Sequence, residues 1–223
     1  LTQNRMTVTK CYTDGKICEP KRLNRRKDRY FLEGYALCND ASILGERIGD
    51  PTELALLDMA AEFEIQREHL EERFPRTQEI AFDSDRKMMT TLHRGEKESI
   101  SYTKGSPDEI LERATFLLEG GERIPMTPER RKVIDQVIHT FTGEALRVLA
   151  LGMRNPASGL TENGLTFIGV VGMADPIRPE AENAVQEFYR AGVKTVMITG
   201  DRIDTAFAIA KELHIASEES ECI

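Results

Sequence analysis

The chain has 223 residues, of which 38 are Asp or Glu and 30 are Lys or Arg, so its formal net charge is −8. This acidic balance argues against a nucleic-acid-binding protein, whose binding surface is usually basic. No stretch approaches the roughly 18 consecutive apolar residues of a membrane helix, and no secretory signal pattern is present. The length suits one or two domains with a packed core, and Leu1 as first residue suggests a piece of a longer protein.

The cysteines and histidines do not have the spacing of a metal or redox site. The 4 cysteines include no C-x-x-C pair, which zinc ribbons and thioredoxin-like proteins share. The 4 histidines are scattered and form no H-E-x-x-H motif. We therefore expect free thiols and no metal site built on cysteine or histidine within the chain.

The N-terminal region shows little regular pattern before its first clear helix signal. Met6–Tyr12 is strand-like, whereas the basic run Lys21–Arg29 is typical of a solvated loop. Asp50 can then cap a helix, with Pro51 at its first position and Glu53 as a capping-box partner. Apolar residues continue this helix at the spacing of one face: Leu54, Leu57 and Ala61.

Residues 80–103 alternate in the manner of a β-hairpin, with a turn near Arg94–Lys97. The second strand leads directly into Lys104-Gly105-Ser106. Here Ser106 is a candidate N-cap with Glu109 as its capping-box partner, so we expect another helix to begin at this point.

Further elements follow as far as residue 173. A helix is expected to begin at Thr127-Pro128 and to stop near Gly143. Ala145–Met153 and Leu165–Met173 are short, nearly continuous apolar runs, which are typical of buried strands. Because hairpins and helices are mixed in this part of the chain, we expect an α+β fold.

The C-terminal part follows a different pattern. A helix is expected from Pro179 to Gly192, followed by a β-branched strand over Val193–Ile198. The turn Thr199-Gly200-Asp201 then leads into another helix. This alternation of strand, turn and helix predicts a parallel α/β sheet.

Two turns that lead into helices have features of anion sites, because the free N–H groups and the dipole of a helix N-terminus attract negative charge. In Lys104-Gly105-Ser106, Lys104 adds positive charge and Gly105 leaves room beside the backbone. The other turn, Thr199-Gly200-Asp201, follows a predicted parallel strand. A plain helix cap explains each turn equally well, and on spacing alone it is the commoner explanation.

Phe82 stands beside a basic stretch that contains Lys87. An aromatic ring next to cations can hold a base by stacking and its phosphates by charge. A core phenylalanine at the start of a strand is the simpler interpretation. Asp175 and Asp201 are candidates for binding Mg²⁺, which prefers carboxylate oxygens, although the sequence Asp175-Pro176 also suits a turn.

Seven short segments, spread along nearly the whole chain, carry a resemblance to a known family. They are Leu1-Thr2-Gln3-Asn4-Arg5-Met6-Thr7-Val8, Gly49-Asp50-Pro51-Thr52-Glu53, Phe82-Asp83-Ser84-Asp85-Arg86-Lys87-Met88-Met89, Lys104-Gly105-Ser106-Pro107-Asp108, Ala145-Leu146-Arg147, Asp175-Pro176-Ile177-Arg178 and Met197-Ile198-Thr199-Gly200-Asp201. Together they resemble the P-type cation-transporting ATPases. The second and third segments are most similar to those of the bacterial type II calcium pumps.

The resemblance implies a nucleotide-binding domain over residues 10–173, with a mainly antiparallel sheet flanked by helices. Residues 1–9 and 174–223 would be parts of an incomplete haloacid-dehalogenase-like phosphorylation domain with a parallel α/β arrangement. In the family, an Asp-Lys-Thr-Gly-Thr motif directly precedes the opening segment, and its aspartate is phosphorylated. This sequence contains neither that motif nor the family's later Gly-Asp-Gly-x-Asn-Asp magnesium segment.

The resemblance also implies an ATP site in the nucleotide-binding domain. Phe82 would stack on adenine and Glu53 would reach the adenine edge. Arg147 would meet the phosphates, whose negative charge it offsets. The full set of residues implied for ATP binding is Glu53, Phe82, Lys87, Lys104, Gly105 and Arg147.

A second group of residues is implied for the phosphoryl site of the intact pump. Thr199, Gly200 and Asp201 would form the catalytic loop beside the phosphorylated aspartate, where positioning and charge neutralisation support phosphoryl transfer. Asp175 and Arg178 would belong to the hinge near the phosphates. ATP and Mg²⁺ would be the cofactors of the intact pump.

The function implied is that of the ATP-binding part of a pump that couples ATP hydrolysis, through an aspartyl-phosphate, to the transport of a cation, here Ca²⁺. We expect a monomeric fragment at the cytoplasmic face of a bacterial plasma membrane, with membrane helices and an actuator domain outside this sequence. It should bind ATP without phosphorylating itself.

One alternative is a haloacid-dehalogenase-like phosphatase, for which only Asp14 lies suitably near the N-terminus. The other is a docking module of the same fold without ATP.

Overall fold

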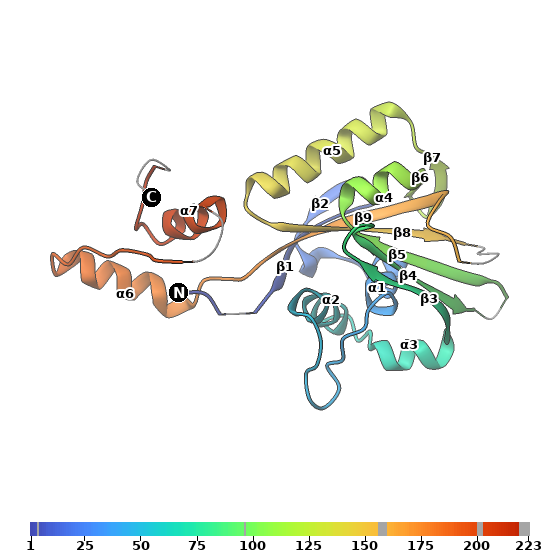
Figure 1. Ribbon diagram of the computed structural model, residues 1–223, viewed down its shortest axis with the longest axis horizontal. Coiled ribbons are helices and arrows are strands. Elements are labelled where there is room, and N and C mark those ends of the chain that lie inside the picture. Colours follow the sequence, from blue (N-terminus) through green and yellow to red (C-terminus); the bar gives the residue numbers. More distant parts are fainter. Residues whose placement is uncertain (4, 96, 156–159, 200–202, 219–223) are drawn as a thin grey trace.

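The computed structural model describes residues 1–3, 5–95, 97–155, 160–199 and 203–218 (Figure 1). A single sheet dominates it, with the strand order β2-β1-β9-β8-β5-β4-β3, while β6 pairs with both β7 and β9. The strands are β1 Thr7–Thr13, β2 Lys16–Cys18, β3 Arg76–Asp83, β4 Met88–Arg94, β5 Ser99–Gly105, β6 Ala114–Glu119, β7 Glu122–Pro125, β8 Arg147–Arg154 and β9 Leu165–Ala174. Of the pairings in the described part of the chain, only that of β6 with β9 is parallel. The expected α+β fold with a mainly antiparallel sheet is confirmed.

Helices cover both faces of this sheet (Figure 1). One face carries α1 Arg29–Leu37, α2 Pro51–Ala61 and α3 Arg67–Arg73, and the other carries α4 Pro107–Arg113 and α5 Pro128–Gly143. A short 3₁₀ helix, Pro20–Arg22, precedes α1. Each face has its own hydrophobic core, one built on α1 and α2 and the other on α4 and α5.

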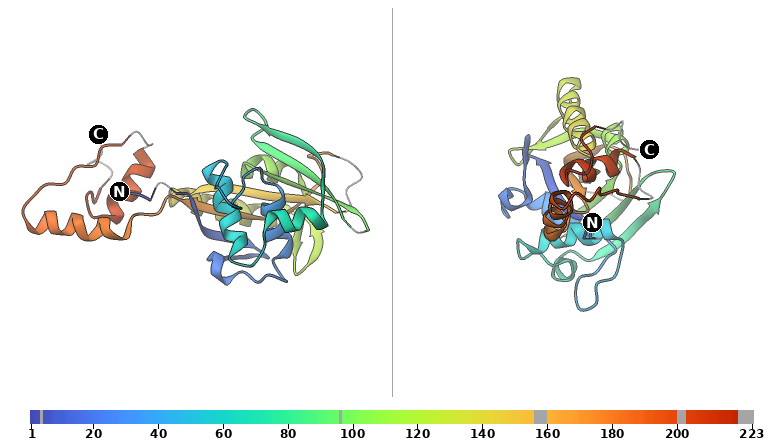
Figure 2. Two further views of the ribbon diagram at one scale, coloured as in Figure 1. Left: turned by 90° about the horizontal axis from the view of Figure 1, so that it is seen from below. Right: turned by 90° about the vertical axis from the view of Figure 1, so that its left-hand side faces the viewer.

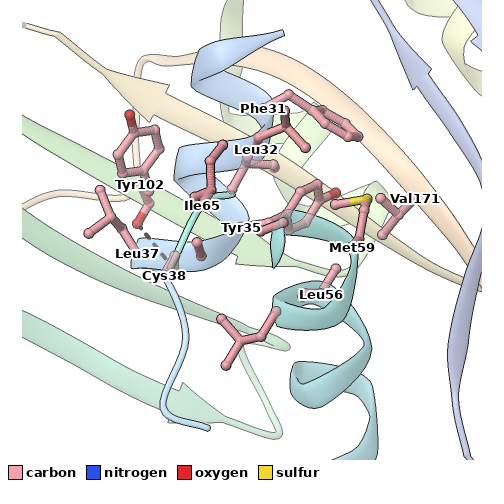
Figure 3. Close-up of a cluster of buried hydrophobic side chains, with 14 of the residues drawn as sticks. Phe31, Leu32, Tyr35, Leu37, Cys38, Leu56, Met59, Ile65, Tyr102 and Val171 are labelled. Carbon is pink, nitrogen blue, oxygen red and sulfur yellow. Dashed lines mark hydrogen bonds between the residues drawn. The ribbon is translucent and has the colours of Figure 1, made fainter. Parts of the chain in front are cut away.

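Helix α1 lies at the centre of the first core, although the sequence analysis did not predict it. Its apolar side chains Phe31, Leu32 and Tyr35 are fully buried against the sheet (Figure 3). A Cβ atom on Gly34 would lie 2.7 Å from atoms of Leu151 and Tyr102 on the sheet. The glycine therefore allows the helix to approach the strands more closely than any other residue would.

The helix starts follow the expected caps only in part. The Asp50 carboxylate accepts a hydrogen bond from the Thr52 N–H at 2.8 Å and caps α2, and the Thr127 side chain caps α5. The capping boxes are wrong: Ser106 makes no side-chain cap, and its expected partner Glu109 binds Arg113 within α4. Glu53 is not a capping-box partner either, because its carboxylate pairs with Lys104, which is distant in the sequence.

The C-terminal elements lie apart from the sheet, as Figure 1 and the left-hand view of Figure 2 show. Helices α6 Pro179–Arg190 and α7 Ile203–Glu212 form as expected. The strand expected over Val193–Ile198 is wrong, since residues 193–199 have no regular structure. Val196 and Ile198 are exposed, and a strand needs a neighbour for its N–H and C=O groups. No other described strand lies there to supply one.

The buried histidine of β4 makes folding stability depend on pH. Desolvation lowers the pKa of His93 from 6.5 to about 4, and its ring contacts the Phe74 carbonyl at 3.0 Å and the Thr91 hydroxyl at 2.9 Å. The unfolded chain therefore binds more protons than the folded chain between these two pKa values, and the stabilisation present above pH 6.5 is lost as the pH falls towards 4. We expect the free energy of unfolding, measured with urea, to fall by about 3 kcal/mol more across this window than in His93→Gln. Equal pH slopes for the two proteins would contradict this assignment.

Candidate functional site

Four strand ends meet at one edge of the sheet. Gly105 at the end of β5 pairs with Met88 at the start of β4 and with Ala150 of β8. In β3, the register shifts between Ile80 and Asp83, so Ala81 and Phe82 together oppose Met89. Met89 in turn pairs with Lys104. The strand register thus places the Phe82 position in the same cross-strand row as Lys104.

Lys104 forms a buried ion pair with Glu53 at this edge. The Lys104 Nζ donates to Glu53 Oε1 at 2.7 Å, and only 6% of the lysine side chain and 17% of the glutamate side chain are exposed. A buried pair of this kind is stable only when both charges keep their partners. Glu53 is therefore a partner of Lys104, 51 residues away, rather than the capping-box residue that its position suggests.

A polar segment after α1 fixes the orientation of Glu53. The Asp40 N–H donates to Glu53 Oε2 at 3.2 Å, and the buried Asn39 side chain donates to the Glu53 carbonyl at 3.0 Å. Arg67 and Arg76 each donate to the Asn39 carbonyl, which holds the segment in place. The sequence analysis missed these residues because they follow a helix that it did not predict.

Arg147 lies at the start of β8 on the α2 face of the sheet. Leu149 and Leu151, which share its face, belong to the core on that side. Burial alone would raise the pKa of Asp50, but hydrogen bonds from Thr52 and the positive charge of Arg147 outweigh it and lower the pKa. Arg147 at the start of β8 is therefore close enough to the start of α2 to act on the charge of Asp50. The Arg147 side chain is exposed.

Gly105 and Lys87 meet through their backbones. A Cβ atom on Gly105 would lie 2.5 Å from the Lys87 carbonyl, which accepts a hydrogen bond from the Ser106 N–H. The space beside Gly105 is thus filled by the chain itself, which corrects the idea that this glycine leaves room for an anion. Lys87 is exposed, and its φ of 55° belongs to the left-handed region.

Phe82 is exposed over 63% of its surface and lies at the end of a strand. The interpretation as a core phenylalanine at a strand start is therefore wrong. An exposed ring on the same edge of the sheet as a buried lysine and two exposed cations suits a flat aromatic ligand that carries negative charge. The structure brings Glu53 and Lys104 into contact and places Phe82, Lys87, Gly105 and Arg147 along the same edge.

Asp175 and Arg178, the residues expected at the hinge, bind the backbone of the N-terminal segment. Asp175 accepts a hydrogen bond from the Arg5 N–H at 3.1 Å, and Arg178 donates to the Thr2 carbonyl at 2.7 Å. Asp175 therefore joins two distant segments in addition to preceding a proline. Thr199 lies in the irregular segment after α6, whereas Gly200 and Asp201 are outside the described residues.

Other features of the described residues lie outside this edge of the sheet or give no sign of a metal or membrane site. A cavity of about 1340 Å³ lies elsewhere, lined by residues of the 24–30 segment and of α3. In the described ranges, no group of three or more His, Cys, Asp and Glu side chains is arranged to hold a metal ion. No helix within them has the length and apolar character needed to span a membrane. Cys11, Cys18 and Cys38 are free thiols.

Comparison with known proteins identifies the family of the chain. Residues 29–180 match the family model described as P-type ATPase, cytoplasmic domain N. The chain is 44% identical over 98% of its length to calcium-transporting ATPase 1 of Bacillus cereus, of which it covers 26%. It is 36% identical over 96% of its length to calcium-transporting ATPases of Listeria monocytogenes and Bacillus subtilis, covering 26% and 28% of them.

The chain thus spans about a quarter of the length of these curated relatives. The match to the family model includes the whole edge at which Glu53, Phe82, Lys104 and Arg147 gather. The fold, the motif order and the similarity over nearly the whole sequence lead to the same conclusion: the chain belongs to the P-type ATPases, and residues 29–180 correspond to cytoplasmic domain N of that family.

Proposed function

We propose that this chain binds ATP at the sheet edge formed by β3, β4, β5 and β8. The observation that carries the proposal is the exposed Phe82 ring in the same cross-strand row as Lys104, whose charge is held by Glu53. The adenine ring would stack on Phe82, and Glu53 would lie at the adenine edge. The exposed side chains of Lys87 and Arg147 would offset the charge of the phosphates.

The role in the whole protein is also a proposal. The relatives are named calcium-transporting ATPases, and we propose that this chain serves a pump of that kind in a bacterial plasma membrane, presenting ATP to an aspartate that this sequence does not contain. The membrane helices and the actuator domain would come from other segments. Residues 1–9 and 174–223 would contribute to the haloacid-dehalogenase-like phosphorylation domain, with the phosphoryl-site loop at Thr199, Gly200 and Asp201. Residues 10–173 would form the nucleotide-binding domain.

Mg²⁺ enters this proposal only as the usual companion of ATP. The described residues include no group of three or more His, Cys, Asp and Glu side chains suited to a metal ion. The chain's own contribution is to bind and orient the nucleotide, which is the positioning part of phosphoryl transfer. Asp175 and Arg178 would set the path of the two segments that leave the sheet, because both bind the N-terminal backbone.

A calorimetric titration of the chain with ATP tests the proposal. We expect saturable, weak binding by a monomer, and no radioactive label retained on the protein after incubation with γ-labelled ATP. Absence of binding at millimolar ATP would contradict the proposal and favour a docking module. Release of phosphate from phosphatase substrates, or label on an aspartate of this chain, would instead favour the phosphatase alternative.

A further inference from the structure

A carboxylate from the loop between β8 and β9 reaches Arg86 in the turn between β3 and β4, which directly follows the strand end that carries Phe82. Glu162 Oε1 accepts hydrogen bonds from Arg86 Nη1 and from the Thr90 hydroxyl, 76 and 72 residues away in the sequence. Only 13% of the Glu162 side chain and 31% of the Arg86 side chain are exposed. The ion pair is therefore shielded from solvent far more than an ordinary surface pair.

The hydroxyl groups beneath Glu162 have one possible direction of donation. The hydroxyls of Thr90 and Thr103 lie 3.0 Å apart on neighbouring strands, and both residues are fully buried. The Thr90 hydroxyl donates to the Glu162 carboxylate. Because a hydroxyl carries a single hydrogen, Thr90 then accepts from the Thr103 hydroxyl. This buried chain fixes Glu162 from the sheet side, while Arg86 binds it from the turn side.

Arg86 also binds the residues on either side of Phe82. Its Nη2 donates to the Ala81 carbonyl, which belongs to the peptide unit that precedes Phe82. Its own N–H donates to the Asp83 carboxylate at 3.0 Å, on the other side of Phe82. Because the Phe82 ring is exposed and has little packing of its own, its position depends on this backbone.

We infer that Glu162 is a positioning residue for the nucleotide base: it holds Arg86, and Arg86 holds the bulge from which Phe82 projects. The inference rests on the proposed ATP site and adds a residue from a loop that does not carry any of the site's motifs. A preorganised ring saves the free energy of ordering one side chain when the base binds. Loss of Glu162 leaves Phe82 in place but makes that ordering part of the binding step.

The test compares ATP and AMP affinities by calorimetry for the wild-type chain, Glu162→Gln, Phe82→Ala and the double variant. We expect Glu162→Gln to weaken both nucleotides by the same factor, about fivefold, since the effect is on the base that they share. In the Phe82→Ala background, the Glu162 change should have no further effect. Glu122→Gln, at an exposed position on β7, is the matched control and should bind as the wild type does.

The outcomes separate this inference from the proposal on which it rests. If the wild-type chain binds no ATP, the proposed function fails. If it binds ATP and Glu162→Gln binds equally well, or if the two changes add fully, only the positioning role is overturned. Thr90→Val is a second variant that tests the positioning role of Glu162, because it removes the hydroxyl donor to Glu162 and keeps the side-chain shape. It should reproduce the affinity loss even if Glu162→Gln fails to fold.

Discussion

Phe82→Ala is expected to weaken ATP binding by roughly 5- to 150-fold while leaving the free energy of unfolding almost unchanged. Stacking of a base on an aromatic side chain contributes about 1–3 kcal/mol, and each 1.4 kcal/mol is a tenfold change in affinity. Folding is spared because the ring is 63% exposed and belongs to neither core. Calorimetric titration with ATP and urea denaturation measure the two quantities.

Two further variants make this result specific. Phe82→Trp keeps a flat aromatic surface and should retain most of the affinity. Phe188→Ala removes another exposed ring, 52% accessible and located on α6 away from the sheet, and should bind ATP as the wild type does. An unchanged affinity in Phe82→Ala would exclude stacking at this edge.

Lys104→Met is expected to affect both folding and binding. The substitution leaves the Glu53 carboxylate without its cation in a site that is only 17% exposed. Breaking a buried pair from one side costs about 3–5 kcal/mol, so unfolding should occur at a much lower urea concentration. Binding of ATP should fall as well, because a cation is lost from the proposed site.

The double variant Lys104→Met/Glu53→Gln separates these two effects. It removes both charges, so most of the lost stability should return while ATP binding stays weak. Glu109→Gln, which breaks the pair with Arg113 on α4, is the matched control, since about a quarter of each of those side chains is exposed. It should cost less than about 1 kcal/mol. Full recovery of ATP binding in the double variant would show that the Lys104–Glu53 pair is only structural.

Local patterns in the sequence predicted most of the sheet and several helix starts. The alternation in β4 and β5 and the apolar runs of β8 and β9 reflect burial, which is visible within a few residues. Asp50 and Thr127 marked true helix starts because a cap acts on its own first turn. Helix α1 was missed because it is short, contains Gly34 and follows a basic run, so its stability comes from packing on the sheet.

The remaining errors concern partners that are distant in the sequence. Glu53 has the spacing of a capping box, but a buried lysine contributed by another strand takes its carboxylate. Val193–Ile198 has the composition of a strand, but no described strand lies beside it to complete its hydrogen bonds. The link from Glu162 to Arg86 joins two loops and has no local signal at all. The motif resemblance selected the site residues, and the strand register explains why most of them share one edge.

The most direct test of the central claim is a chemical-shift map of the chain during titration with ATP. The proposed site predicts that the largest changes occur in residues 81–89 and at Glu53, Lys104 and Arg147. The cavity lined by the 24–30 segment and α3 lies elsewhere on the molecule, and its residues should not respond. Changes confined to Arg26, Tyr30 and Arg73, with none at Phe82 or Lys104, would contradict the account.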